Sequence, residues 1–108
     1  MRVVEGADDP EQWQLGSYLV LTDVVIDAVL GIGSDRPLDA ELRRLMASIQ
    51  ELRRESKRAK LVAIDLPTGV DADTGACDDA CFPADVTLAL GAPKAGLFRF
   101  PGAACVGR

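Results

Sequence analysis

The chain has 108 residues, 48% of them apolar, and its formal net charge is −5. This length limits it to one small domain, and the apolar fraction is too high for a disordered chain. The acidic balance excludes non-specific binding to nucleic acid or to an anionic membrane surface. The sequence contains no histidine, which excludes a Ser/His/Asp triad and a catalytic Cys/His pair.

The first strand is predicted at residues 22–28, "TDVVIDA". Before it, residues 1–7 contain a few strand-like residues, and the Asp-Asp-Pro sequence at 8–10 signals a turn. Residues 11–21 remain ambiguous between helix and strand. The run at 22–28 is rich in β-branched residues and almost continuously apolar, which is typical of a strand buried on both faces in a parallel sheet.

A helix is predicted to follow Pro37. Its apolar residues fall at helical spacing and form one stripe: Leu38, Leu42, Leu45, Met46, Ile49 and Leu52. Asp35 and Asp39 would favour the positive end of the helix dipole, and the arginines near residue 53 would favour its negative end. We interpret the basic residues between 43 and 60 as a solvated helix face.

Two further strands are predicted at residues 61–66, "LVAIDL", and 85–90, "DVTLAL". A helix between two buried strands indicates a right-handed β-α-β unit and therefore an α/β fold. A parallel sheet needs helices on both faces, yet only one helix is predicted for three strands. Either the missing layer comes from another chain, or the sequence is part of a larger domain.

The three cysteines are Cys77, Cys81 and Cys105. An odd number of cysteines, in a sequence where we find no targeting segment, predicts reduced thiols and a cytoplasmic location. The "CDDAC" spacing is C-x3-C rather than C-x2-C, and there is no histidine to complete a zinc site. We therefore interpret the cysteines as small loop or core residues.

Each predicted strand ends in a loop rich in glycine and proline: "IDAVLGIGSDRP", "AIDLPTGVDADTG" and "LALGAPKAG". Ligands of open parallel sheets bind at the carboxyl ends of the strands, so Asp27, Asp65 and Lys94 should converge on one edge. The "GIGSDR" segment lacks the third glycine of a dinucleotide fingerprint and is no P-loop. Two interpretations stay open for it, namely an ordinary strand-to-helix turn and a phosphate site assisted by Arg36.

The carboxylates in these loops have alternative roles. Asp65 either points into the cleft or caps a turn, and Asp71 and Asp73 look like loop caps. The Asp27 carboxylate and the Thr68 hydroxyl would supply two hard oxygen ligands. Such ligands suit an alkali or alkaline-earth cation better than a transition metal.

Taken together and in this order, "DVVIDAVLGIGSDRPL", "AIDLPTGVDADTG" and "FPADVTLALGAPKAGLFRFPGA" resemble the YjeF N-terminal domain family over residues 20–108. The resemblance implies a Rossmann-like, three-layer parallel sheet, here incomplete, and NAD(P)H-hydrate epimerase activity. Such an isomerase interconverts the R and S forms of hydrated NADH and NADPH for nucleotide repair. The implied partner is a NAD(P)H-hydrate dehydratase, with its fusion to the same chain and a homodimer both left open.

The resemblance also implies roles for individual residues. Asp27 and Thr68 would bind a potassium ion, with threonine where the family usually has serine. Asp65 would contact the substrate and is our candidate for the charge or proton shuttle in catalysis, and Lys94 is the second catalytic candidate. The residues that would line the substrate site are Gly31, Ile32, Gly33, Ser34, Asp35, Arg36 and Pro37.

One large departure from the family pattern accompanies the resemblance. The family's asparagine- and glycine-rich loop, like "NNGGDG", has no counterpart here. We therefore expect residues 1–108 to be a partial domain that lacks its N-terminal portion, with little turnover and marginal stability on its own. The alternatives are a non-catalytic nucleotide-binding or interaction module, and one piece of a bifunctional epimerase/dehydratase.

Overall fold

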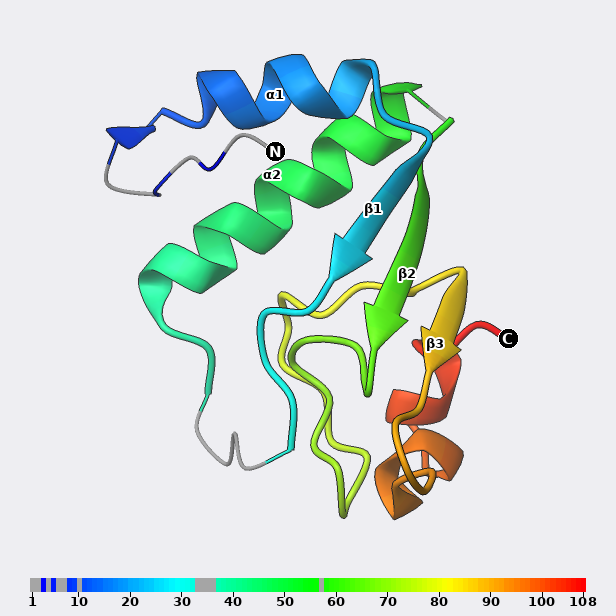
Figure 1. Ribbon diagram of the computed structural model, residues 1–108. Helices are drawn as coiled ribbons and strands as arrows, with labels where there is room; N and C mark the ends of the chain where they lie inside the picture. The colour runs from blue at the N-terminus through cyan, green and yellow to red at the C-terminus, as the bar shows by residue number, and fades with distance from the viewer. Residues whose placement is uncertain (1–2, 4, 6–7, 10, 33–36, 57) are drawn as a thin grey trace.

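The computed structural model describes residues 3, 5, 8–9, 11–32, 37–56 and 58–108. Its main elements in chain order are α1 (Trp13–Val20), β1 (Val24–Asp27), α2 (Ala40–Ser56), β2 (Lys60–Ile64), β3 (Val86–Leu88) and two 3-10 helices, η2 (Ala95–Phe98) and η3 (Gly102–Ala104). The N-terminal elements and the 3-10 helices lie at opposite ends of the molecule (Figure 1). None of the helices in the described ranges combines the length and hydrophobicity needed to cross a membrane.

The three strands form one parallel sheet in the order β1-β2-β3, with Val25 opposite Leu61 and Val62 opposite Val86. All three predicted strands are confirmed, although each is shorter than its apolar run. The α2 helix connects β1 to β2, so the β-α-β unit expected from the change of hydrophobic period is present. The fold is an incomplete α/β fold of the Rossmann-like type.

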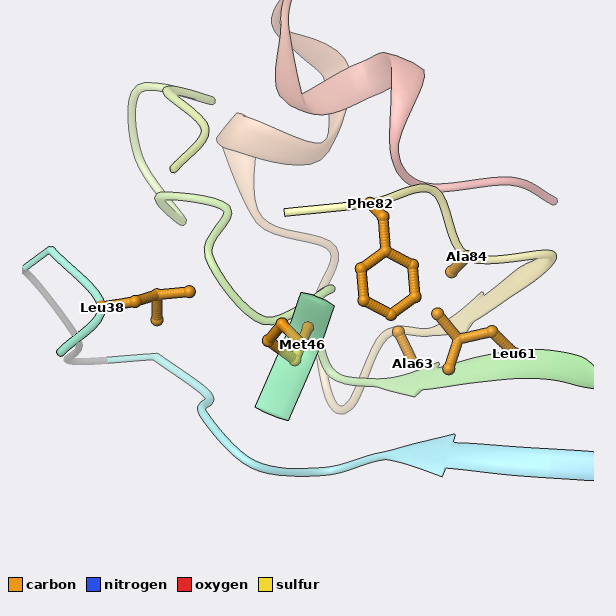
Figure 2. Packing of buried hydrophobic residues seen from close by; sticks show 6 residues of the cluster. All are labelled: Leu38, Met46, Leu61, Ala63, Phe82 and Ala84. Atoms are coloured by element: carbon orange, nitrogen blue, oxygen red, sulfur yellow. The ribbon is translucent and has the colours of Figure 1, made fainter. Parts of the chain in front are cut away.

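The α2 helix covers one face of the sheet. The core on this face consists of six buried residues, shown in Figure 2: Leu38, Met46, Leu61, Ala63, Phe82 and Ala84. On the opposite face, Val24, Ile26 and Leu88 expose 51%, 64% and 51% of their surface. The expectation of a missing helix layer is therefore confirmed for the described residues, because one face of this parallel sheet remains uncovered.

The start of α2 follows the sequence signals. Asp39 precedes the helix and accepts the backbone N–H of Leu42 at 2.8 Å, as an N-cap residue does. Leu38 lies before the helix but is 6% exposed, so it belongs to the core as the apolar stripe predicted. A capped first turn next to a buried leucine fixes where the loop after β1 enters the helix.

The α1 helix is the main element that the sequence did not predict. Asp9 accepts the backbone N–H groups of Gln14 and Leu15 at 3.2 and 3.0 Å, and thereby satisfies donors of the first turn from a distance. Gly16 faces α2, where the nearest atom to a Cβ built on it is Cδ1 of Leu52, 3.9 Å away. The predicted turn at residues 8–10 thus contains Asp9, whose carboxylate accepts hydrogen bonds from the first turn of α1. Of residues 1–7, only Val3 and Glu5 are described, and neither lies in a strand.

The interpretation of residues 43–60 as a solvated helix face is wrong for two arginines. Arg43 donates to Asp78 at 2.6 Å, and Arg53 donates to Asp85 at 2.6 Å. The Arg53 guanidinium also lies 5.8 Å from the centre of the Phe82 ring. Both arginines reach across to the segment before β3, which the helical pattern alone cannot indicate.

Asp85 makes folding stability dependent on pH. Its carboxylate accepts the Leu61 backbone N–H at 2.8 Å and contacts Arg53 and Lys60. The Leu61 hydrogen bond, assisted by Lys60, lowers the pKa of Asp85 below its usual value. A lowered folded-state pKa stabilises the fold above the unfolded pKa of about 3.9, and this contribution is lost as pH falls through the folded value.

We therefore expect the urea midpoint to fall from about pH 5 to pH 3, and to fall less steeply in Asp85→Asn. Urea titrations followed by circular dichroism at several pH values would measure both slopes. Equal slopes for the two proteins would contradict this assignment.

Close backbone contacts hold the 69–79 loop against η2 and η3. Gly96 donates its N–H to the carbonyl of Ala72 at 2.7 Å, and Gly102 donates to that of Gly75 at 2.8 Å. A Cβ built on Gly96 would lie 2.0 Å from the carbonyl oxygen of Asp71. Glycine is therefore required at position 96 because another backbone segment occupies the space of a side chain.

Candidate functional site

The candidate site lies at the carboxyl edge of the sheet, where the loops after β1, β2 and β3 begin. Because the strands are parallel, these loops leave the sheet on the same edge (Figure 1). The predicted site residues in the described ranges form two contacting pairs, Asp27 with Thr68 and Asp65 with Lys94. The predicted convergence is thus confirmed for Asp65 with Lys94, while Asp27 contacts Thr68.

Asp27 is the last residue of β1, and Thr68 lies in the loop after β2. The Thr68 hydroxyl donates to Oδ1 of Asp27 at 2.6 Å, and the Thr68 backbone N–H donates to Oδ2 at 2.8 Å. Thr68 is 0% exposed and Asp27 is 5% exposed. The Leu30 backbone N–H donates to the Thr68 hydroxyl oxygen at 3.3 Å, so the pair is enclosed by protein.

The chemistry of this pair suits a hard cation. Carboxylate and hydroxyl oxygens are the ligand types that alkali and alkaline-earth ions prefer, and the polar atoms of the Asp27 and Thr68 side chains are all oxygens. Both Asp27 oxygens accept a hydrogen bond yet keep lone pairs, and the hydroxyl hydrogen can rotate away from an ion. The two side chains could therefore contribute two ligands to such an ion.

Thr68→Val should destabilise the chain by about 2–3 kcal/mol, because it leaves a buried carboxylate oxygen without its hydroxyl donor. Thr68→Ser keeps the hydroxyl and should restore most of the stability. Thr22→Val is the matched control, since the Thr22 hydroxyl bonds the Tyr18 carbonyl at an exposed position and its loss should change stability by less than about 0.5 kcal/mol. Urea unfolding would measure all three; equal losses in both valine variants would contradict the buried-pair account.

Asp65 and Lys94 form an ion pair between the loops after β2 and β3. Their side chains are 13% and 15% exposed, and the Lys94 ammonium also donates to the Leu90 carbonyl at 2.9 Å. Asp65 has a backbone φ of 75°, a left-handed conformation that is uncommon outside glycine. Such conformations concentrate at functional sites, where the surrounding structure enforces them.

The surroundings of Asp65 keep it ionised. The hydrogen bond from Lys94 lowers the pKa of the Asp65 carboxyl below its usual value. Burial opposes this effect, and weaker contributions from the backbone N–H groups of Leu90 and Ile32 support it. At neutral pH the pair therefore presents an ionised carboxylate and a cationic ammonium group.

The segment after β1 joins the two pairs. The Leu30 backbone contacts Thr68, and a Cβ built on Gly31 would lie 3.8 Å from Oδ2 of Asp65. This arrangement brings the predicted substrate residues Gly31 and Ile32 next to Asp65. The predicted residues Gly33, Ser34, Asp35 and Arg36 lie outside the described residues.

A cavity of about 380 Å³ opens beside this segment, between the start of α2 and the 69–79 loop. It shares Gly31 and Pro37 with the predicted substrate site, but Asp27, Asp65 and Thr68 do not line it. Its lining residues are Leu30, Gly31, Pro37, Leu38, Arg43, Leu66, Gly69, Val70, Asp71, Ala76, Cys77, Asp78 and Asp79.

Sequence reasoning missed the Arg43–Asp78 ion pair in the wall of this cavity. Asp78 accepts hydrogen bonds from Arg43 at 2.6 Å and from the Leu38 backbone N–H at 3.1 Å, which ties the cavity wall to the start of α2. Asp71 accepts from the Thr74 hydroxyl at 2.6 Å, which confirms the predicted loop cap. The two consecutive aspartates of the "CDD" sequence mark Asp78 as a candidate polar residue. Its ion pair could not be predicted, because Arg43 is distant in the chain.

The comparisons with known proteins agree on one family. The family described as "YjeF-related protein N-terminus" matches residues 3–96. The chain is 39% identical over 108 residues to "NAD(P)H-hydrate epimerase" from Clavibacter michiganensis subsp. michiganensis. The aligned segment covers 97% of the chain and 47% of that protein. It is 41% identical over 87 residues to the protein of the same name from Microbacterium testaceum, covering 79% of the chain and 33% of that protein.

A third relative is named as a bifunctional enzyme and is longer than the other two. "Bifunctional NAD(P)H-hydrate repair enzyme Nnr" from Thermofilum pendens is 35% identical over 100 residues, which is 93% of the present chain and 18% of that protein. The chain thus spans less than half the length of these curated relatives. The family match extends over most of its residues, and the chain belongs to the YjeF-related N-terminal family.

Proposed function

We propose that the chain forms part of an NAD(P)H-hydrate epimerase site, which interconverts the R and S forms of hydrated NADH and NADPH. The observation that supports this most is the Asp65–Lys94 ion pair next to Gly31, at the edge where α/β sheets bind ligands. The names of the relatives supply the reaction, because two of them are called NAD(P)H-hydrate epimerases.

The reaction makes limited chemical demands. The hydrate has a hydroxyl on the carbon beside the ring nitrogen, and the nitrogen lone pair can expel it to leave a planar cation. Water then adds to either face of the ring, which gives the other epimer. The site must protonate the departing oxygen and stabilise the positive charge of the cation.

The two members of the ion pair suit these two tasks. Asp65 is ionised because its pKa is lowered, so its negative charge can stabilise the planar cation. The Lys94 ammonium is the adjacent proton donor and can give a proton to the departing hydroxyl oxygen. In the reverse direction the same groups would accept the proton and orient the attacking water.

We also propose that Asp27 and Thr68 bind a potassium ion. Their buried carboxylate and hydroxyl oxygens favour this ion class, and the threonine keeps the hydroxyl that a serine would supply. A cation there would offset the negative charge of the substrate's phosphates. The remaining ligands would come from water, backbone carbonyls or other segments.

The described cavity can hold only part of such a substrate. Its 380 Å³ lies at the small end of ligand pockets, whereas a hydrated dinucleotide is a large ligand. We therefore propose that residues outside this chain, of the kind found in an asparagine- and glycine-rich loop, complete the site. The isolated chain should then show little turnover.

A dehydratase is the proposed functional partner, because the epimerase only supplies the epimer that such an enzyme consumes. Some relatives are named bifunctional NAD(P)H-hydrate repair enzymes, which favours a partner fused to the same polypeptide in those proteins. We also propose that a second copy of this chain can be a partner, in a homodimer.

A hybrid enzyme tests the proposed function. In the Clavibacter epimerase, the segment aligned with this chain is replaced by residues 1–108, and interconversion of the NADPH hydrate epimers is followed by chromatography. We expect the hybrid to work within about tenfold of its parent, a change of about 1.4 kcal/mol in activation energy. A folded hybrid without turnover would contradict the proposal.

The alternative is a non-catalytic nucleotide-binding module. It predicts a hybrid that binds the hydrate, as seen in equilibrium dialysis, but does not interconvert its epimers. The exposed sheet face gives this alternative some support, because such a surface is typical of interaction modules.

A further inference from the structure

All three cysteines of the chain gather in one place. The sulfur atoms of Cys77, Cys81 and Cys105 lie within 4.8 Å of one another, and those of Cys77 and Cys105 are 3.9 Å apart. None of the three forms a disulfide. This cluster could not be predicted from residue spacing, because Cys105 is remote in the chain from the "CDDAC" segment.

Backbone hydrogen bonds position each of the three residues. Cys77 forms an isolated bridge with Val70, the Cys81 N–H donates to the Asp78 carbonyl at 2.8 Å, and the Cys105 carbonyl accepts the Ala84 N–H at 2.9 Å. Their side chains pack against the buried cluster of Leu66, Val70 and Leu97. The three thiols are therefore presented by an ordered framework and not by loose surface chain.

The 3.9 Å distance between the Cys77 and Cys105 sulfurs matches the spacing around a single ion, and the other two sulfur pairs lie within 4.8 Å. A metal with bonds of about 2.3 Å to three thiolates places the sulfurs about 3.8–4.0 Å apart. We propose that Cys77, Cys81 and Cys105 form a binding site for a soft, thiophilic metal ion. Thiolate ligands select ions such as Zn²⁺, Cd²⁺ and Cu⁺, in contrast to the hard-cation chemistry of Asp27 and Thr68.

An ion can reach this cluster from the cavity. Cys77 lines the cavity, and so do Asp71 and Asp79, whose negative charges would raise the local concentration of cations, whereas the charge of Asp78 is paired with Arg43. The cavity also gives a water molecule access as a fourth ligand for an ion that prefers tetrahedral coordination.

Binding exchanges protons for the metal. Burial raises the pKa of Cys77 to about 11 and also raises that of Cys81, so these two thiols carry their protons when no ion is bound. Each metal–sulfur bond replaces an S–H bond, and the proton goes to solvent. No electron is transferred in this step.

Titration of the reduced 108-residue chain with Cd²⁺ alone, under anaerobic conditions, tests the site. We expect thiolate-to-metal charge-transfer absorption in the ultraviolet that saturates at one ion per chain. Each of Cys77→Ser, Cys81→Ser and Cys105→Ser should weaken Cd²⁺ binding by about 100-fold, since one of three ligands is lost. Ala104→Ser is the matched control, because it adds a hydroxyl at an exposed position beside Cys105, outside the cavity lining, and keeps all three thiols.

Several outcomes would overturn the proposal. One is absorption that does not saturate at one ion, and another is undiminished Cd²⁺ affinity in Cys105→Ser, which would leave Cys105 out of the site. A third is a count of one free thiol in anaerobically purified chain, which would indicate a disulfide in place of a metal site. Circular dichroism separates loss of a ligand from loss of the fold in the serine variants. This site does not depend on the proposed epimerase function.

Discussion

Gly96→Ala is expected to destabilise the chain by about 4 kcal/mol or more, which is enough to unfold a small domain. A Cβ at this position would lie 2.0 Å from the carbonyl oxygen of Asp71 and 2.9 Å from the backbone of Ala72. Both are main-chain atoms and cannot rotate away. The methyl group must therefore separate the 69–79 loop from η2. Urea unfolding followed by circular dichroism would measure the loss.

Two glycines serve as controls. Gly91 has a φ of 70° but no atom within 4 Å of a built Cβ, so Gly91→Ala tests backbone strain alone and should cost about 1 kcal/mol. Gly31→Ala meets only Oδ2 of Asp65 at 3.8 Å, an ordinary contact, and should change stability by less than about 0.5 kcal/mol. A Gly96→Ala chain as stable as Gly91→Ala would show that the close approach of the two segments is wrong.

Asp65→Asn is expected to lower the turnover of the hybrid epimerase by about 100-fold or more, the usual size of a lost charge or proton-transfer contribution. The amide has no negative charge for the planar cation, and Lys94 loses its charged partner. Because its pKa is lowered, Asp65 stays ionised across about pH 5 to 8, so turnover of the unmodified hybrid should show no acidic limb from this group there. Chromatography of the NADPH hydrate epimers over time measures the rates.

Asp73→Asn is the matched control, because it removes the same charge from an exposed residue of the 69–79 loop. Its turnover should equal that of the unmodified hybrid. If Asp65→Asn retains full turnover with the fold intact, Asp65 has no role in the chemistry. A fall of equal size in both variants would point to net charge and not to the Asp65–Lys94 pair.

The sequence predicted the elements whose signals are local. Unbroken β-branched runs gave the three strands, and the spacing of Leu42, Met46 and Ile49 gave α2, since these patterns reflect burial on the sheet and on one helix face. The α1 helix was not predicted because its first turn depends on Asp9, five and six residues away from the N–H groups that it accepts. A capping residue so far from its helix leaves no N-cap pattern to recognise.

The site was predictable to a similar extent. The rule that parallel strands present their carboxyl ends together was enough to bring Asp65 towards Lys94, and the oxygen chemistry of Asp27 and Thr68 pointed to that second pair. The cavity and its Arg43–Asp78 ion pair were not predictable, because they depend on how the 69–79 loop folds back against α2. Loop conformations of this kind are set by long-range contacts and not by residue spacing.

The pairing register of β1 has a consequence for Asp27. Val25 and Asp27 point to the same face of the strand, and Val25 packs in the core under α2. A slip of one residue would place Ile26 under the helix and turn the Asp27 carboxylate to the uncovered face, away from Thr68. The apolar contact that anchors β1 under α2 thus also aims the Asp27 carboxylate at Thr68, so a substitution that removes the Val25 contact should weaken the Asp27–Thr68 pair without altering either residue.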